Sequence, residues 1–373
     1  MKRLLFIILC CFSHWISIYG ARPFITLLAS ECGANAGTIG LISAAFSAVQ
    51  VVLALIIGKV MDKKGTRFVM IVGNAILVVS TVILTQTRQI PLIFIASALM
   101  GISHIMVMLT AQVLTIGFRK GRERGRAVGL YTFGNSAGIF LGPYFGALLF
   151  ERLGSNRGFY GVVITSLLSL IFSAFVMNQK RETTERQISL KEIINDRPLF
   201  RTVLSGSFVL FVAEVNTTFF PLHGQALNLS VKTIGTVLST YGMASMLVRP
   251  FLGKLVQWLS TYRLMIICMT VGGISMAFFG VVHSAALFLI LGAILGSTLG
   301  ILGPTTMLAT ANITPEQDRS KVMAIRAMIN YFGQATSPLV FGYLVSVISI
   351  NGIYWVSGAM LASSSFICVK DQE

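Results

Sequence analysis

Charged residues are scarce in this chain. Only 11% of its 373 residues are Asp, Glu, Lys or Arg, whereas a soluble globular domain carries about 25%. So little charge cannot cover a surface exposed to water, which excludes a soluble enzyme and a disordered protein. Cysteines are few as well, five in all. They form no CxxC motif or Cys/His cluster, which excludes a disulfide scaffold and a zinc site.

Apolar residues, in contrast, make up 55% of the chain, and the mean hydropathy is +0.81. A membrane-spanning helix needs about 20 apolar residues. Lipid offers the backbone no hydrogen-bond partner outside a helix or a closed barrel, and the alternating pattern of barrel strands is missing. The sequence therefore predicts an all-α membrane protein with twelve transmembrane helices, at about 4–29, 37–61, 67–86, 91–117, 127–150, 158–177, 203–223, 232–256, 263–282, 285–311, 323–347 and 351–368.

The positive charge is unevenly distributed. A net charge of +16 can indicate nucleic-acid binding, but there is no soluble domain to bind nucleic acid. If the N-terminus is inside, all but five of the 29 basic residues lie on the cytoplasmic side, as membrane proteins require. We therefore predict a multi-pass protein of the cell (inner or plasma) membrane with both termini in the cytoplasm. The five exceptions are Arg22, Arg88, Arg152, Arg157 and Lys232.

One long polar stretch divides the predicted spans into six and six. It predicts an N-terminal half at 1–178, a cytoplasmic linker with a short amphipathic helix at 179–201, and a C-terminal half at 202–373. The halves repeat each other at an offset of 195 residues, and the matches include residues that shape the backbone. Gly101, Asn135, Gly138 and Pro143 return as Gly296, Asn330, Gly333 and Pro338. Two six-helix repeats around a midplane site are typical of secondary transporters.

The loop between the second and third spans carries a motif with Gly58, Asp62, Gly65 and Arg67. It resembles the loop signature of the major facilitator superfamily, Gly-x-x-x-Asp-(Arg/Lys)-x-Gly-x-(Arg/Lys). We expect Gly58 to permit close helix approach, Gly65 to form a tight turn, and Asp62 to latch the cytoplasmic face by accepting from a helix N-terminus or a basic residue. The second half lacks the acid, so the latch is one-sided. The alternative is a generic basic cytoplasmic loop.

The fifth span carries Gly138, Gly142, Pro143 and Gly146. This pattern resembles the antiporter signature of the same superfamily, Gly-x-x-x-Gly-Pro-x-x-Gly-Gly, except that Ala147 stands at the final glycine. Glycines at four-residue steps make a smooth face for close helix packing, and proline bends the helix. The resemblance implies an exporter of the drug:proton antiporter type; packing of small residues without any such meaning is the alternative.

Glu214 is the one acidic residue predicted to lie deep in the membrane. A charge at this depth costs about 3 kcal/mol on insertion scales, and such residues usually face the protein interior and serve the function. Burial disfavours the charged form of a carboxyl group. Glu214 is therefore our first candidate for proton coupling, and a structural carboxyl group is the alternative.

One face of the first span carries Trp15, Tyr19 and Arg22 at helical spacing, and we expect it to line a solute cavity. Arg22 could bind an anionic group of the solute or pair with Glu214. Snorkelling to the outer surface is the alternative, because Arg22 lies near that end of the span.

The fourth span offers a second candidate for proton coupling. Many proton-coupled exporters of the superfamily carry an arginine four residues before a glycine in this span, where this chain has Ser97 before Gly101. Without that arginine, either transport is not coupled to protons, or coupling uses Glu214 or His104, and histidine is a residue type that titrates near neutral pH. Other predicted cavity residues, for which helix-to-helix contact is the alternative role, are Met108, Gln112, Asn135, Phe211, Thr218, Asn330 and Gln334. Arg249 is expected to snorkel to the cytoplasm.

The resemblance covers nearly the whole chain and implies alternating access around a central cavity, with no metal or organic cofactor. We predict a secondary active transporter, not an enzyme: a monomeric, proton-coupled exporter of a small amphiphilic or charged solute, such as a drug-like compound or a metal chelator. A symporter or facilitator that imports a sugar or an organic acid is the alternative.

Two other classes of protein fit poorly. Residues 134–138 match the Gly-x-Ser-x-Gly motif of hydrolases, but Ser136 lies in an apolar span and not at the strand–turn–helix elbow that this motif requires. A membrane receptor would need a signalling domain, and no loop or tail is long enough to form one.

Overall fold

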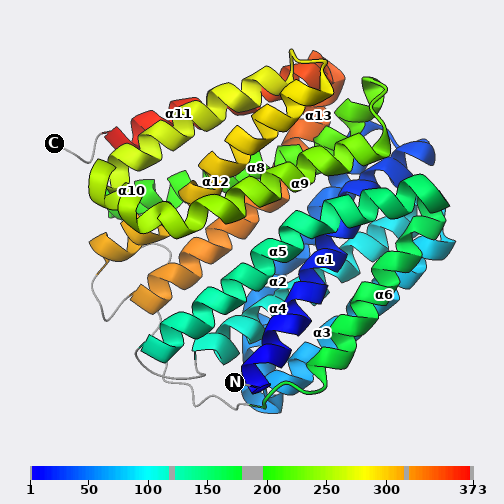
Figure 1. Cartoon of the computed structure of the whole chain (residues 1–373), viewed down its shortest axis with the longest axis horizontal. Helices are drawn as coiled ribbons and strands as arrows, with labels where there is room; N and C mark the ends of the chain where they lie inside the picture. Colours follow the sequence, from blue (N-terminus) through cyan, green and yellow to red (C-terminus); the bar gives the residue numbers. More distant parts are fainter. Residues whose placement is uncertain (1, 117–121, 179–195, 315–318, 370–373) are drawn as a thin grey trace.

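The computed structural model describes residues 2–116, 122–178, 196–314 and 319–369, which form helices joined by short turns and include no strand (Figure 1). The first six helices are α1 (Lys2–Glu31), α2 (Ala36–Lys64), α3 (Thr66–Gln86), α4 (Ile90–Ile116), α5 (Arg122–Leu153) and α6 (Ser155–Ser173). The remaining helices are α8 (Arg197–Ala226), α9 (Val231–Val248), the 3₁₀ turn η1 (Arg249–Phe251), α10 (Leu252–Leu259), α11 (Thr261–Phe279), α12 (Ala285–Ile313) and α13 (Arg319–Val369).

These helices make the twelve predicted spans. Nine of the described helices are long and apolar enough to cross a membrane. One of them, α13, is two helices that meet at Ser349, whose φ of 73° interrupts the helical backbone. The shorter α6 completes the first six helices, and α9, η1 and α10 together form one span of the second six. The span predicted to reach residue 177 ends earlier, at Ser173.

The repeat at an offset of 195 residues is also visible in the backbone. Six described residues have a left-handed φ, a conformation that costs roughly 1–2 kcal/mol for any residue other than glycine, and they fall into three pairs at that offset. Gly33, Gly65 and Gly154 correspond to Asn228, Ser260 and Ser349. Each pair lies in a tight turn between two antiparallel helices, so the same turn geometry is built twice from different residues.

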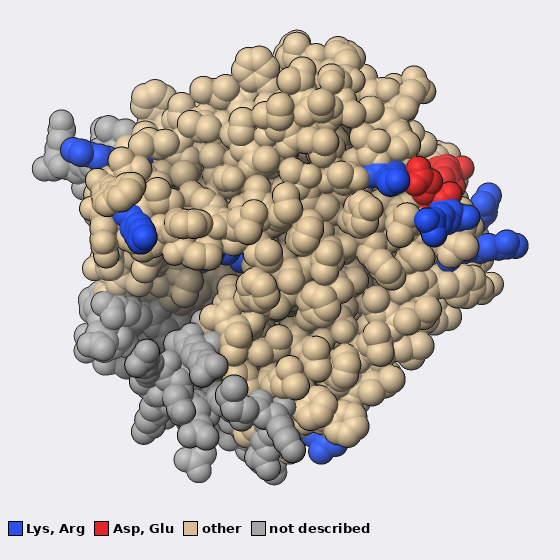
Figure 2. Space-filling model, in the orientation of Figure 1, with Lys and Arg blue, Asp and Glu red and all other residues tan. Residues whose placement is uncertain are grey.

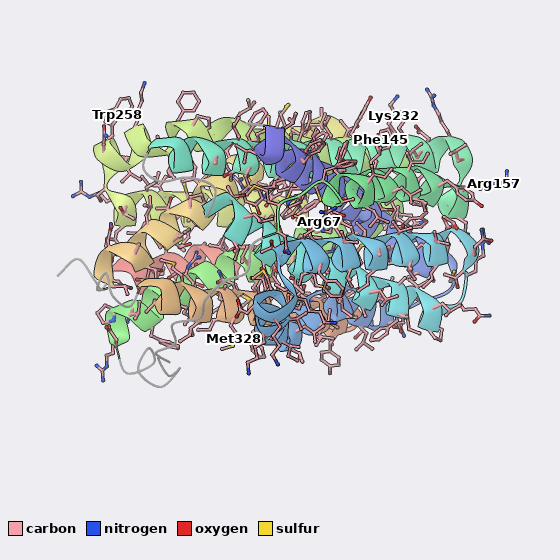
Figure 3. The ribbon with its side chains drawn as sticks, turned by 90° about the horizontal axis from the view of Figure 1, so that it is seen from below. Arg67, Phe145, Arg157, Lys232, Trp258 and Met328 are labelled. Carbon is pink, nitrogen blue, oxygen red and sulfur yellow. The ribbon has the colours of Figure 1, made fainter. Side chains whose placement is uncertain are left out.

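The two ends of the molecule carry different connections between the helices, and we call them the linker end and the opposite end. The linker end carries Lys2, the turn at Gly65 and the start of α8; the opposite end carries the turns at residues 32–35, 154 and 227–230. In Figure 3, Trp258 lies at the linker end and Arg157 at the opposite end. Figure 2 shows charged side chains near both ends of one face and an uncharged band between them, as a membrane-spanning surface requires.

Contacts between the halves concentrate toward the opposite end. A Cβ atom on Gly40 of α2 would collide with the carbonyl oxygen of Pro338 in α13, and one on Gly235 of α9 would lie 2.7 Å from that of Pro143 in α5. These two contacts are related by the repeat. All four residues lie in the part of their helices nearer the opposite end, so the halves are closed there. On the linker side Figure 2 shows a hollow between them, with Lys or Arg atoms visible inside it.

Candidate functional site

An ion pair joins the two halves in the interior. The guanidinium of Arg22, on α1, donates to a carboxylate oxygen of Glu214, on α8. Both side chains are buried, with 10% and 5% of their surface exposed, and the guanidinium also lies over the ring of Phe46, 4.1 Å from its centre. Among the described residues it is the only ion pair. Arg22 therefore does not snorkel to the surface, and the two candidates proposed from the sequence contact each other.

A pair of buried histidines lies beside this ion pair. His104 Nδ1, on α4, is 3.2 Å from His14 Nε2, on α1, and the other nitrogen of His14 is 3.3 Å from Asn74 Oδ1, on α3. Phe46 links the two groups, because its ring also lies 5.5 Å from that of His104. Sequence reasoning singled out His104 but missed His14 and Asn74. A second histidine in an apolar span was the available signal.

Tyr19 lies at the contact between the halves. Together with Pro23, Pro143, Asn216 and Tyr241 it lines a small cavity between α1, α5, α8 and α9. Trp15, one turn before Tyr19, packs its ring edge-on against His104, with ring centres 4.9 Å apart. The aromatic face predicted for the first span thus connects the histidine pair to the interface cavity.

Several other predicted cavity residues have unused hydrogen-bonding capacity. An unpartnered buried polar atom costs about 1–3 kcal/mol, so such atoms mark places where a solute or water can bind. Among the described residues they include Trp15 Nε1, Asn135 Oδ1, Thr218 Oγ1 and Asn330 Oδ1. Asn135 and Asn330 are related by the repeat and place the same amide group in α5 and α13.

The remaining predicted cavity residues are less informative. Phe211 packs against Phe341, with ring centres 5.4 Å apart. The Met108 sulfur accepts a hydrogen bond from the Tyr131 hydroxyl at 3.7 Å. Gln334 is half-buried and Gln112 is exposed.

Arg249 does not snorkel to the linker end as expected. Its Nη1 donates to Ser136 Oγ, on α5 of the other half, at 2.7 Å, and its Nη2 to Ser245 Oγ at 3.4 Å. The side chain is half-buried. Helix α9 ends one residue earlier, at Val248, and a neighbouring helix supplies the hydroxyl that replaces water.

The loop motif is only partly explained by the structure. Gly65 has a φ of 87°, and its N–H donates to the Met61 carbonyl at 2.8 Å, as a tight turn requires. Within the described residues the expectation for Gly58 finds no support: none of their atoms lies within 4 Å of a Cβ placed there, so no described helix approaches Gly58 closely. Asp62 is half-buried and has no ion-pair partner among the described side chains, while the Arg67 side chain is exposed.

The glycine-rich face of α5 packs against α1. A Cβ on Gly138 would lie 2.5 Å from Trp15 Cβ, and one on Gly146 would lie 2.5 Å from the Gly20 carbonyl oxygen. A Cβ on Gly142 would lie 2.9 Å from Tyr19 Cβ. These glycines therefore set the position of the α1 face that carries the candidate site, while Pro143 on the other side of α5 contacts α9.

Twelve spans among the described residues, arranged in two related halves with an ion pair between them, fit the architecture of a membrane transporter. The model of the Major Facilitator Superfamily matches residues 7–259 and 202–371, which together cover nearly the whole chain. The chain belongs to this superfamily. It is accordingly a transporter of small-molecule solutes and not an enzyme.

Known proteins similar to this chain include a drug efflux pump and a multidrug resistance protein. It is 24% identical to the multi-drug resistance efflux pump PmrA homolog of Lactococcus lactis, over 99% of this chain and 93% of that protein. It is 22% identical to the multidrug resistance protein MdtG of Yersinia enterocolitica, over 100% and 94%.

Solved structures with the same fold include a POT family transporter in complex with a thioalcohol-conjugated peptide. Its TM-score is 0.79 at 12% identity, covering 99% of this chain and 95% of that one. The nucleoside transporter NupG has a TM-score of 0.80 at 11% identity, covering 99% and 98%. At these identities the likeness concerns the fold alone.

Proposed function

We propose that this protein is a proton-coupled exporter of a small amphiphilic or charged solute, acting as a monomer in the cell membrane with its linker end in the cytoplasm. The observation that carries the proposal is the buried Arg22–Glu214 pair, which joins the two halves. The similarity to an efflux pump of Lactococcus lactis supports the direction of transport.

The ion pair gives protonation a mechanical effect. While Glu214 is ionised, Arg22 holds α8 against α1. Adding a proton to the carboxylate removes its charge, and Arg22 is then left without its acidic partner in a buried site, which is unfavourable. Protonation therefore loosens the contact between halves that must separate for the opposite end to open. Deprotonation restores the contact, so the proton and the change of access are coupled.

The His14–His104 pair is the second candidate for the proton. A single proton can lie between Nε2 of one ring and Nδ1 of the other. The positive charge of the protonated pair would lie close to Arg22, because the ring of Phe46 contacts both His104 and Arg22. Because two cations repel, protonating the histidine pair would also weaken the Arg22 contact. The two candidates thus predict the same movement but assign the proton to different residues.

Uphill transport in proteoliposomes separates the candidates. A panel of drug-like solutes is screened for uptake driven by a pH gradient, and the same solute is then followed in a downhill exchange assay. Glu214→Gln keeps the shape of the side chain and removes its titration, so we expect uphill transport to be lost and downhill exchange to survive. His104→Ala should retain uphill transport. Glu151→Gln, an exposed acid at the opposite end, is the matched control.

The reverse pattern, with uphill transport lost in His104→Ala and kept in Glu214→Gln, assigns the proton to the histidine pair. If wild-type transport does not respond to the pH gradient, the protein is not coupled to protons and the proposal fails.

A further inference from the structure

Positive charge exceeds negative charge where the halves meet. Glu214 neutralises Arg22, but Arg249 contacts no acidic side chain within the described ranges. Its two hydrogen bonds go to the hydroxyls of Ser136 and Ser245, and its Nε is buried with no partner at all. Hydroxyl groups can accept hydrogen bonds but carry no charge, so the charge of this guanidinium is not compensated.

A second arginine of the C-terminal helices is in the same situation. Arg326, on α13, donates from Nη2 to Thr306 Oγ1 at 2.8 Å and to the Gly303 carbonyl at 3.4 Å. Its Nε is also buried and unpartnered. An arginine in the membrane is expensive, and such residues are usually paired or serve the function. Two such residues without acids leave the described interior with a positive charge, and that charge favours an anion.

The surroundings of Arg249 resemble a binding site more than a structural contact. Ser245, which accepts from the guanidinium, follows Tyr241 by one helical turn on α9, and Tyr19 lines the same cavity as Tyr241. Both tyrosines line the small interface cavity, where Asn216 adds a buried amide oxygen without a partner. The prolines of this cavity, Pro23 and Pro143, supply apolar surface. Arg249 itself does not line this cavity, so a solute that uses both regions would place an anionic group at Arg249 and an aromatic or aliphatic body against the tyrosines and prolines.

We propose that the exported solute carries an anionic group, a carboxylate, sulfonate or phosphate, and that Arg249 binds this group while Tyr19 and Tyr241 contact the body of the solute. The inference rests on the function proposed above and adds the class of solute. The planar guanidinium donates two parallel hydrogen bonds to such a group. Since Ser136 belongs to α5 and Ser245 to α9, an anion on Arg249 competes with the contact between α5 and α9. A cationic solute meets an uncompensated positive charge instead.

Equilibrium binding to the purified full-length protein in nanodiscs tests the inference without any gradient. Two fluorescent probes share one aromatic body: N-phenyl-1-naphthylamine is neutral, and 8-anilinonaphthalene-1-sulfonate carries a sulfonate. We expect the wild-type protein to bind the sulfonate more tightly than the neutral amine. Arg249→Gln should lower the sulfonate affinity by about tenfold or more, as expected for loss of a hydrogen bond to a charged group, and should leave the amine affinity unchanged.

Further variants keep the test decisive. Arg249→Lys retains the charge and should lose less sulfonate affinity than the glutamine variant, and Arg326→Gln should reduce it by a smaller factor. Arg263→Gln, which removes an exposed arginine on α11, should leave both probes unaffected. Equal affinity of the wild type for the two probes overturns the inference. An unchanged sulfonate affinity in Arg249→Gln and also in Arg326→Gln overturns it as well.

Sulfate, titrated in parallel, tells a site for inorganic anions from a solute site. A wild-type protein that binds sulfate as tightly as the sulfonate probe contradicts an organic solute. Failure of the proposed function is distinct, because it leaves this binding result intact: selective sulfonate binding without transport in proteoliposomes contradicts the exporter and keeps the anion site. Transport of cationic or neutral solutes without sulfonate binding contradicts the anion site and keeps the exporter.

Discussion

The packing of α5 on α1 can be tested with the same substitution at two glycines of one helix. Replacing glycine by alanine in a helix is favourable by about 1 kcal/mol, because alanine loses less conformational freedom. At Gly129 a Cβ atom has no atom of the described residues within 4 Å, so only this gain is expected there. At Gly142 the same atom would lie 3.0 Å from the Gly20 nitrogen and 3.1 Å from the Ile16 carbonyl oxygen.

Those neighbours are backbone atoms of α1, which cannot rotate away as a side chain can. Overpacking of this kind costs about 1–3 kcal/mol. We therefore expect Gly129→Ala to stabilise the protein slightly and Gly142→Ala to be neutral or destabilising. Gly146→Ala should be the most damaging of the three, because its Cβ would lie 2.5 Å from a carbonyl oxygen. The larger Gly142→Leu should separate the helices and stop transport.

The assay is thermal unfolding of the purified variants in one detergent, with transport measured on the same preparations. We expect Gly129→Ala to be the most stable of the three variants, Gly142→Ala the next and Gly146→Ala the least stable. Equal stability changes at all three positions would mean that α5 does not pack on α1 through these glycines. The reasoning would then be refuted, together with the placement of the site face of α1.

Three further predictions concern the turns. Asp62→Asn should impair transport at unchanged membrane insertion, because the charge lies at a helix end near water; normal transport by well-expressed variant protein would contradict the latch. Gly65→Ala should lower thermal stability by about 1–2 kcal/mol, because its φ is 87°, whereas Gly58→Ala should not, and equal effects would refute this account of the turn. Burial raises the pKa of the Cys32 thiol, so at about pH 8 a membrane-impermeant maleimide should label it more slowly than free cysteine, with a rate that rises with pH; labelling as fast as that of free cysteine would contradict this.

Much of the fold could be predicted from the sequence because the membrane imposes it locally. Apolar length sets where each span begins and ends, and small residues at fixed positions set the turns. The repeat could also be recognised in the sequence, because Gly101 and Gly296 occupy corresponding positions that only a small residue can fill. The backbone carbonyl of Phe46 approaches Gly101, and that of Tyr241 approaches Gly296. The backbone conformation at Gly65 could be expected for the same reason.

Sequence alone also indicated which residues are expensive to bury, and Glu214 and His104 stand out as polar groups in apolar spans. It could not decide their partners. Arg22 and Glu214 are 192 positions apart, and His14 and His104 are 90 apart. Whether such residues meet depends on the rotation of each helix about its axis and on how deeply the halves dock. Arg249 illustrates the limit: its position near a helix end predicts snorkelling, but the docking of α5 brings Ser136 to it and keeps the charge inside. The type of buried group is therefore encoded locally, whereas its partner is decided only by the tertiary packing of the two halves.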